Sequence, residues 1–199
     1  MPPAAEPAVE NIPTSRLVAF VGRLESIAED KTAPCAGDSS CVMMDAVYDA
    51  SYTVLVPLQG RIEQEAIRFR IFDHSGFPRF AQHRHALLFV LMTDKAAVLV
   101  KYQGFEMQPL AQGGWGSCGN PDGRAALEPQ PLQFAPDVYF GSVSGLADAA
   151  VAEEFEPEYF DIRDRRAYCR KGVTAQALAE ALYPRLLQAL RATQVDGAE

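Results

Sequence analysis

The chain has 199 residues, of which 48% are hydrophobic and 22% charged, a composition that suits a substantial globular domain and excludes a largely disordered chain. Its net charge of −8 argues against nucleic acid and anionic membranes as partners, because phosphate neutralisation requires clustered lysine and arginine side chains. A basic protein is the partner that this charge favours. No apolar run approaches the roughly 20 residues that cross a bilayer, so no transmembrane segment is expected.

Residues 1–15 are rich in proline, alanine and glutamate, which predicts a flexible leader. This segment has neither a basic region nor an apolar core, so it is not a signal peptide as it stands. One hypothesis is that a signal or lipoprotein leader was removed upstream, which would leave an exported protein with or without a lipid anchor.

Five strand signals follow the leader, separated by short turn-rich stretches, at 16–30, 42–60, 65–73, 85–94 and 95–110. The third has the clearest alternation of apolar and charged residues, which is typical of a strand with one buried face. The fourth is a nearly continuous apolar run, which is typical of a central strand. Gly22 is expected at a bend or bulge and Gly104 at a break. Because no helical periods separate the strands, we predict a mainly β fold whose core, residues 16–124, is a small five-stranded OB-like β-barrel.

The pattern changes after residue 110, because residues 111–124 are glycine-rich and turn-prone. Residues 125–194 predict an irregular and helical C-terminal extension packed on the barrel, and residues 195–199 a frayed tail. Within the extension we expect one short edge strand at 138–140 and a short helix inside 146–160.

The strongest helix signal spans residues 172–194. Thr174 can serve as its N-cap, and Val173 and Leu178 occupy the two positions of a hydrophobic staple. Leucines recur every four residues and predict one apolar face. Pro184 is expected to kink this helix or divide it in two.

Four cysteines allow three pairings, of which we favour Cys35–Cys41 together with Cys118–Cys169. The first pair brackets a short loop of small residues, and the second would join a late segment to a glycine-rich loop. No Cys-x-x-Cys motif is present, which disfavours a zinc ribbon or a thioredoxin-like redox site. Disulfides indicate an oxidising compartment, so we expect the periplasm or cell envelope; four reduced thiols are the alternative.

Three stretches, AFVGRLESI, YTVLVPLQG and HALLFVLM, together resemble the netrin-like module that is shared with tissue inhibitors of metalloproteinases. Residues 20–22 match its opening strand, and residues 58–60 match its second strand end with glutamine in place of lysine. Residues 87–89 match its central strand, while HRH stands where the module usually has a glycine-containing segment. SCGNPDG is similar to its cysteine-bearing loop, so the resemblance covers about residues 16–124.

That resemblance implies an OB-type barrel, of which bacterial versions exist, and a binding role. It does not imply metalloproteinase inhibition by the family's route. Those inhibitors chelate zinc with an N-terminal cysteine, whereas the first cysteine here is Cys35.

The three histidines raise the question of a metal site. His83 and His85 are two residues apart, so on a strand they project from the same face, and Asp73 or His74 could add a third ligand. Alternatively, His83, Arg84 and His85 simply form the polar start of the central strand. The lack of any spaced zinc motif favours the second interpretation, and we expect neither a metal nor another cofactor.

No catalytic motif is complete. The stretch GSVSG has Val143 where a nucleophile elbow has serine, and GGWGSCG lacks the Lys-Ser/Thr ending of a phosphate-binding loop. Carboxylate pairs such as Glu153 and Glu154 are expected to be solvated. We therefore predict that the protein is not an enzyme.

Aromatic residues are the candidate binding groups. Trp115 lies among glycines and is either a lid over one barrel end or an exposed anchor for a partner. With Tyr102 and Phe105 it could line a barrel mouth. Phe155 and Tyr159 belong to the acidic run EEFEPEYFD, which suits a basic partner unless its aromatic rings dock inward.

These features predict a non-enzymatic exported protein-binding module, such as an inhibitor, an immunity protein or an envelope-assembly partner. The first alternative is binding of a small ligand or glycan at the barrel mouth. The second is a metal-dependent enzyme centred on His83 and His85.

Overall fold

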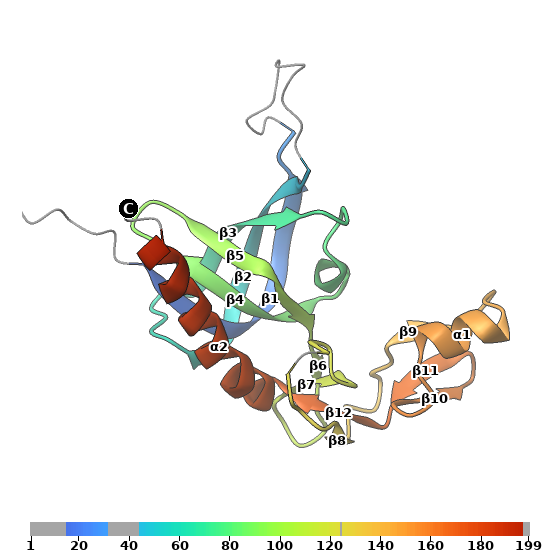
Figure 1. The fold of residues 1–199 in the computed structure, drawn as a ribbon. Helices are drawn as coiled ribbons and strands as arrows, with labels where there is room; N and C mark the ends of the chain where they lie inside the picture. Colours follow the sequence, from blue (N-terminus) through green and yellow to red (C-terminus); the bar gives the residue numbers. More distant parts are fainter. Residues whose placement is uncertain (1–14, 32–43, 124, 197–199) are drawn as a thin grey trace, which may run out of the picture.

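The structure, a computed structural model, describes residues 15–31, 44–123 and 125–196. Five strands close into a barrel in the order β1-β2-β3-β5-β4, and β1 pairs with both β2 and β4 (Figure 1). All neighbours are antiparallel except β3 and β5, which pair in parallel. The predicted mainly β fold with a small five-stranded OB-like barrel is confirmed. The barrel strands are β1 (Arg16–Glu29), β2 (Ala46–Gln59), β3 (Ala66–Asp73), β4 (His85–Met92) and β5 (Ala97–Glu106).

The barrel interior is filled by side chains. In β3, Ile67, Phe69 and Ile71 are each at most 3% exposed and belong to one interior cluster. This burial follows from the period-two alternation of the strand. The short 3-10 helix η1 (Arg79–Gln82) places Phe80 in the same cluster. The sequence analysis did not predict η1, because four residues are too few to show a helical period.

Gly22 lies at a bend, as predicted. The register between β1 and β2 shifts between Val21 and Gly22. A Cβ atom at Gly22 would lie 2.9 Å from the Phe20 ring and 3.1 Å from Cβ of Tyr52. The glycine is therefore required by close packing as well as by the bulge.

The predicted break at Gly104 is wrong, because β5 continues past it. Residues 100–103 instead bulge between the pairs that β5 makes with β4 at Leu99 and Gly104, and Tyr102 has a φ of 61°. A Cβ atom at Gly104 would lie 2.6 Å from the Phe80 ring. The glycine makes room for this ring at the barrel end.

Strand β4 is buried on both faces, which explains its continuous apolar sequence. Leu88 and Val90 point into the barrel, whereas Leu87 and Phe89 belong to a second cluster on its outer surface. The helix α2 (Ala175–Asp196) covers this outer cluster with its leucines. The barrel wall thus lies between two apolar cores.

The start of α2 has the predicted features. The Thr174 hydroxyl accepts a hydrogen bond from the N–H of Ala177 at 3.2 Å, which is the N-cap interaction. Val173 and Leu178 are both buried in the outer cluster. The predicted division at Pro184 is wrong, since α2 continues through it as one helix. Packing on both sides of the proline against the barrel offsets the lost backbone hydrogen bond.

Two small sheets follow the barrel. Two of their strands lie within residues 108–118, which were assigned to the barrel core, and the others lie where the sequence analysis expected an irregular and helical segment. The expected edge strand at 138–140 is also wrong, because the strand there begins at Gly141. Strands of two to four residues show no alternation pattern, so their pairing depends on distant segments. The four-stranded sheet contains β6 (Gln108–Pro109), β7 (Trp115–Cys118), β12 (Lys171–Thr174) and β8 (Gln130–Pro131); the three-stranded sheet contains β10 (Phe160–Arg163), β11 (Arg166–Cys169) and β9 (Gly141–Ser142).

The three-stranded sheet and the short helix α1 (Asp148–Glu154) form a projection that we call the arm, residues 134–170. Helix α1 lies within the predicted helical segment. Figure 1 shows the arm extending away from the barrel beyond the four-stranded sheet. No helix in the described part of the chain is long and apolar enough to cross a membrane.

Replacing Leu178 with alanine tests the outer core. The side chain is fully buried between α2 and the barrel, so the substitution is expected to lower the free energy of unfolding by about 2–5 kcal/mol. Leu146→Ala is the control, because Leu146 is 39% exposed. Urea denaturation of both variants measures the difference, and equal losses would contradict this account of α2.

Candidate functional site

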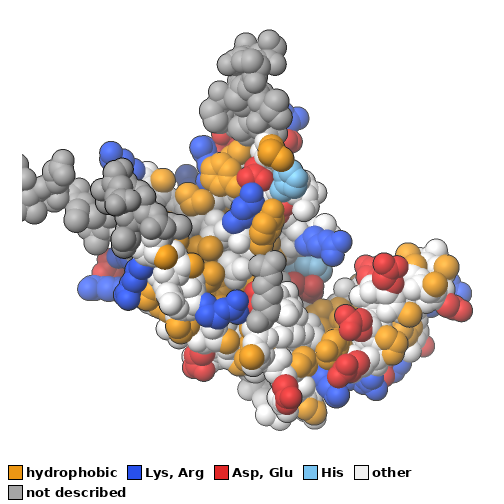
Figure 2. All heavy atoms as spheres, viewed as in Figure 1, with side chains coloured by type: hydrophobic (Ala, Val, Ile, Leu, Met, Phe, Trp, Pro, Cys, Tyr) orange, Lys and Arg blue, Asp and Glu red, His pale blue; other side chains and the backbone are white. Residues whose placement is uncertain are grey.

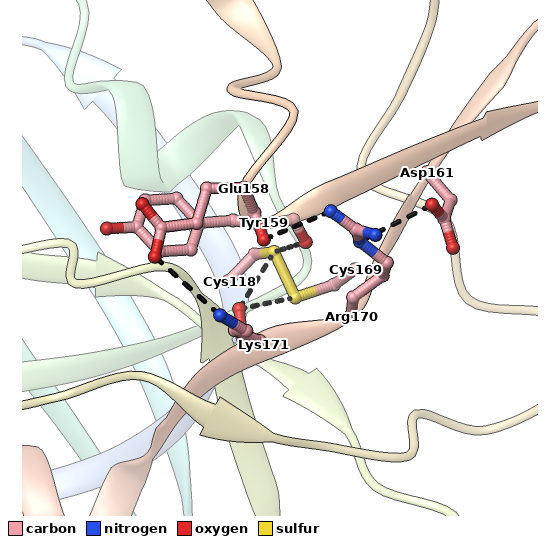
Figure 3. The surroundings of a disulfide bond; sticks show 7 residues. All are labelled: Cys118, Glu158, Tyr159, Asp161, Cys169, Arg170 and Lys171. Atoms are coloured by element: carbon pink, nitrogen blue, oxygen red, sulfur yellow. Dashed lines mark hydrogen bonds and ion pairs between the residues drawn. A yellow bond between two sulfur atoms is a disulfide. The ribbon is translucent and has the colours of Figure 1, made fainter.

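A disulfide joins the arm to the four-stranded sheet. Cys118 at the end of β7 bonds to Cys169 at the end of β11, with Cα atoms 5.6 Å apart (Figure 3). This confirms the favoured pairing of these two residues. The predicted Cys35–Cys41 bond lies outside the described residues.

Polar contacts surround this disulfide (Figure 3). The N–H of Arg170 donates to the carbonyl of Tyr159 at 2.8 Å, and the N–H of Gly119 donates to the carbonyl of Lys171 at 2.9 Å. Arg170 also forms an ion pair with Asp161, at 3.3 Å. The base of the arm is therefore held by covalent, backbone and ionic contacts together.

A chain of four phenylalanine rings forms the interior of the arm. Phe134 contacts Phe140, Phe140 contacts Phe160, and Phe160 contacts Phe155, with ring centroids 5.0, 5.8 and 5.3 Å apart. Gly141 lies against the last ring, where a Cβ atom would come within 2.6 Å of it. The arm thus has a small aromatic core of its own.

The inward position of these rings leaves the acidic residues outside. Residues 146–162 contain six aspartate and glutamate residues and no lysine or arginine. Asp161 and Glu158 are paired with Arg170 and Lys171. The others form no ion pair among the described residues and are exposed: Asp148, Glu153, Glu154 and Glu156. We call these four residues the acidic edge; Figure 2 shows acidic side chains along one side of the arm.

The structure places the two candidate binding residues of the acidic run in the interior of the arm or at its base. Phe155 is 7% exposed and belongs to the aromatic core. Tyr159 is half-buried, and its ring lies 3.1 Å from the Cβ position of Gly119, next to the disulfide. Their aromatic rings therefore stabilise the arm, while the neighbouring carboxylates form its surface.

The three residues that were expected to line a barrel mouth do not form one site. Phe105 is buried in the outer cluster, and Trp115 packs against that cluster while its ring lies 4.5 Å from the His85 ring. Tyr102, in contrast, is 56% exposed on the bulge of β5, beside Lys101. Trp115 is therefore a packing residue of the outer cluster.

The histidines have separate partners. His83 lies 3.1 Å from Glu106, His85 contacts Trp115, and His74 lies 3.7 Å from Asp45. Within residues 15–31, 44–123 and 125–196, no group of three His, Cys, Asp or Glu side chains is arranged to hold a metal ion. Asp73 instead accepts a hydrogen bond from the backbone N–H two residues later.

Burial shifts the pKa of two groups at this end of β4 and β5. Burial raises the pKa of Glu106, although a hydrogen bond from Gln108 and the nearby His83 act in the opposite direction. Burial also lowers the pKa of His85, with a smaller contribution from the positive charges of Arg84 and Arg23. Sequence analysis did not single out Glu106, since no motif links it to histidines twenty residues earlier.

Two surface pockets flank residues 131–138, the segment that leads into the arm. The larger has a volume of about 510 Å³ and lies between this segment and the β10–β11 hairpin. The smaller, of about 390 Å³, lies between the same segment and the turn after β6. Trp115, Tyr102 and Phe105 line neither of them.

No family model matches the chain, and neither the curated proteins nor the solved structures contain a significant match to it.

Removing the disulfide should loosen the arm selectively. Cys118→Ser with Cys169→Ser removes a cross-link between residues 51 apart in the sequence, for which chain entropy predicts a loss of about 4 kcal/mol or less. Amide hydrogen exchange in β10 and β11 is expected to accelerate, while exchange in β4 serves as the internal reference. Unchanged exchange in both hairpin strands would show that the other contacts suffice.

The lowered pKa of His85 predicts a pH-dependent stability. The folded protein keeps this ring neutral at pH values where the unfolded chain, with its ordinary value of 6.5, binds a proton. The contribution of His85 to the free energy of unfolding is therefore expected to be largest above pH 6.5 and to decrease as the pH falls from 6.5 to the lowered pKa of the folded state.

His85→Gln should reduce this slope, as measured by urea denaturation between about pH 8 and about pH 5. His74→Gln, which changes an exposed histidine, is the control. An identical slope in wild-type protein and His85→Gln would contradict the prediction.

Proposed function

We propose that this chain is a non-enzymatic, exported protein-binding module whose arm recognises a partner with a basic surface. An inhibitor, an immunity protein or an envelope-assembly factor would each fit this description. The observation that carries the proposal is the acidic edge, four exposed carboxylates on a projection that is fastened to a rigid barrel.

The position of two of these carboxylates is unfavourable for the isolated protein. Glu153 and Glu154 lie in the last turn of α1, where the helix dipole is negative, and no basic residue lies in that turn. Helix α1 also has no buried residue and no side-chain cap. Lysine or arginine side chains of a partner would compensate this negative charge, which gives the arrangement a use in binding.

The construction of the barrel agrees with a binding role at the surface. Aromatic and aliphatic side chains fill its interior, and α2 covers one outer side. The arm is the element that projects from this body (Figure 1). The resemblance to a netrin-like module stays a prediction, and it too would imply a binding role.

Export is part of the proposal and rests on the disulfide. Disulfides form and persist in oxidising compartments such as the periplasm, and they are rare in the cytosol. The Cys118–Cys169 bond fastens the element that we propose as the recognition site. Periplasmic or envelope localisation would therefore keep the arm in the conformation that binds.

Neutralising the acidic edge tests the proposal. Immobilised protein is incubated with envelope extract, and captured proteins are quantified by mass spectrometry for wild type and for Glu153→Gln/Glu154→Gln/Glu156→Gln. A specific partner is expected to be captured by wild type and reduced about ten-fold or more with the triple variant, since charged contacts are lost. High salt should have a similar effect.

The control is Glu63→Gln/Glu65→Gln, which neutralises two exposed carboxylates between β2 and β3, outside the arm. Its capture should equal that of the wild type. If the arm variant and the control capture the same proteins in the same amounts, the acidic edge is not the recognition site.

A further inference from the structure

Positive charge is concentrated in the segment that runs from the end of β10 to the start of β12. Residues 163–171 contain five arginine and lysine residues and one aspartate, whereas the whole chain has a net charge of −8. Arg170 and Lys171 are paired with carboxylates of the arm. Arg163, Arg165 and Arg166 are exposed and form no ion pair within the described residues. Figure 2 shows basic side chains gathered along the lower edge of the arm.

Two of these arginines lie directly opposite each other. Arg163 of β10 and Arg166 of β11 are register partners in the antiparallel pair. Partners in such a pair project from the same face of the sheet, and like charges there are destabilising. Neither arginine forms an ion pair within the described residues, and an anion bound between the two side chains would reduce the repulsion.

The guanidinium groups are held in place by tyrosine rings. The guanidinium carbon of Arg163 lies 4.4 Å from the ring centroid of Tyr168, and that of Arg166 lies 4.7 Å from the ring centroid of Tyr139. Stacking on a ring uses the face of a guanidinium and leaves its N–H edges free. These free edges can donate two parallel hydrogen bonds to a carboxylate.

The turn of this hairpin contains two charged residues in backbone conformations that favour glycine. Asp164 and Arg165 both have left-handed backbone conformations, with φ of 48° and 59°. A two-residue turn of this kind is normally formed by Asn-Gly or a similar pair, because other side chains are strained there. The strained backbone of this turn places a third arginine, Arg165, next to Arg163 and Arg166.

A pocket with both polar and apolar lining adjoins Arg163. The pocket of about 510 Å³ is lined by Leu132, Phe134 and Val138 on one side and by Arg163, Asp164 and Tyr168 on the other. Its volume is within the range of roughly 300–1,000 Å³ that is usual for ligand sites. A leucine or similar side chain could occupy it while a neighbouring carboxylate meets Arg163.

From this geometry we propose that the hairpin and its pocket bind an acidic peptide segment of a partner protein. Carboxylates of the segment pair with Arg163 and Arg166, and an apolar side chain between them enters the pocket. A nucleic acid fits less well, because the net charge of −8 and the nearby acidic edge repel a continuous polyanion. This site is separate from the acidic edge and has the opposite charge, so it does not depend on the proposed function.

Fluorescence anisotropy with a defined probe tests the proposal. The probe is a fluorescein-labelled synthetic peptide of alternating glutamate and leucine, and the comparison peptide has lysine in place of glutamate. The glutamate peptide is expected to bind at least about ten-fold more tightly than the lysine peptide. Arg163→Gln/Arg166→Gln should weaken the glutamate peptide by about ten-fold or more, because two charge-assisted contacts are lost.

The matched control is Arg61→Gln/Arg68→Gln, which removes two exposed positive charges from the barrel side of the molecule. It should leave the affinity for the glutamate peptide unchanged. An equal loss in both double variants would show non-specific attraction and overturn the proposal. So would full displacement of the peptide by inorganic phosphate at a similar concentration, because the site would then select an anion and not a peptide.

Two further measurements keep the interpretation clear. Chemical-shift changes on adding the peptide should concentrate at Leu132, Val138 and Tyr168, and changes confined to the barrel would contradict the site. Glu153→Gln/Glu154→Gln/Glu156→Gln should bind the glutamate peptide at least as well as wild type. If the capture experiment on the acidic edge fails, the peptide-binding experiment therefore still tests the arginine site.

Discussion

The burial of β1 and β4 on both faces is the constraint on which the rest of this structure depends. Their inward side chains form the barrel interior, and their outward side chains, such as Leu87 and Phe89, would be exposed without α2. Because α2 must lie across this surface, the strand β12 that leads into it is placed as well. β12 pairs with β7, and β7 carries Cys118, the residue that fastens the arm. The position of the arm thus follows from the need to cover one side of the barrel.

The arm differs from the barrel in how it is stabilised. Its core is a single line of four phenylalanine rings, and its base is held by one disulfide and a few polar contacts. Its surface carries two features that cost stability in the isolated chain, carboxylates at the negative end of α1 and two arginines opposite each other in a hairpin. Local conflicts of this kind are expected where a protein binds something else. Their opposite charges distinguish the two binding sites that we propose on the arm.

The sequence analysis predicted the barrel well because its strands are long and regular. Isoleucine and phenylalanine alternate with arginine in β3, and Gly22 lies at a bulge as expected. Gly104 was misinterpreted, since its role is to admit the Phe80 ring from a segment about twenty residues away. In the candidate site, the acidic run was recognised but its aromatic residues were considered as ligand contacts. The arginines of the hairpin were overlooked, although five cations in nine residues of an acidic chain are visible in the sequence.

What the sequence by itself determined is local: the five strand runs, the capped helix α2 and the separation of acidic from basic residues along the arm. These features depend on the spacing and type of consecutive residues, which set the backbone conformation and the buried face. Tertiary structure alone decided which surface each apolar face contacts. It placed Phe105 and Trp115 outside the barrel and left Tyr102 exposed. It also placed Arg163 opposite Arg166. Such contacts join strands whose pairing and register are selected by the packing of the whole chain, and no short stretch of sequence contains that information.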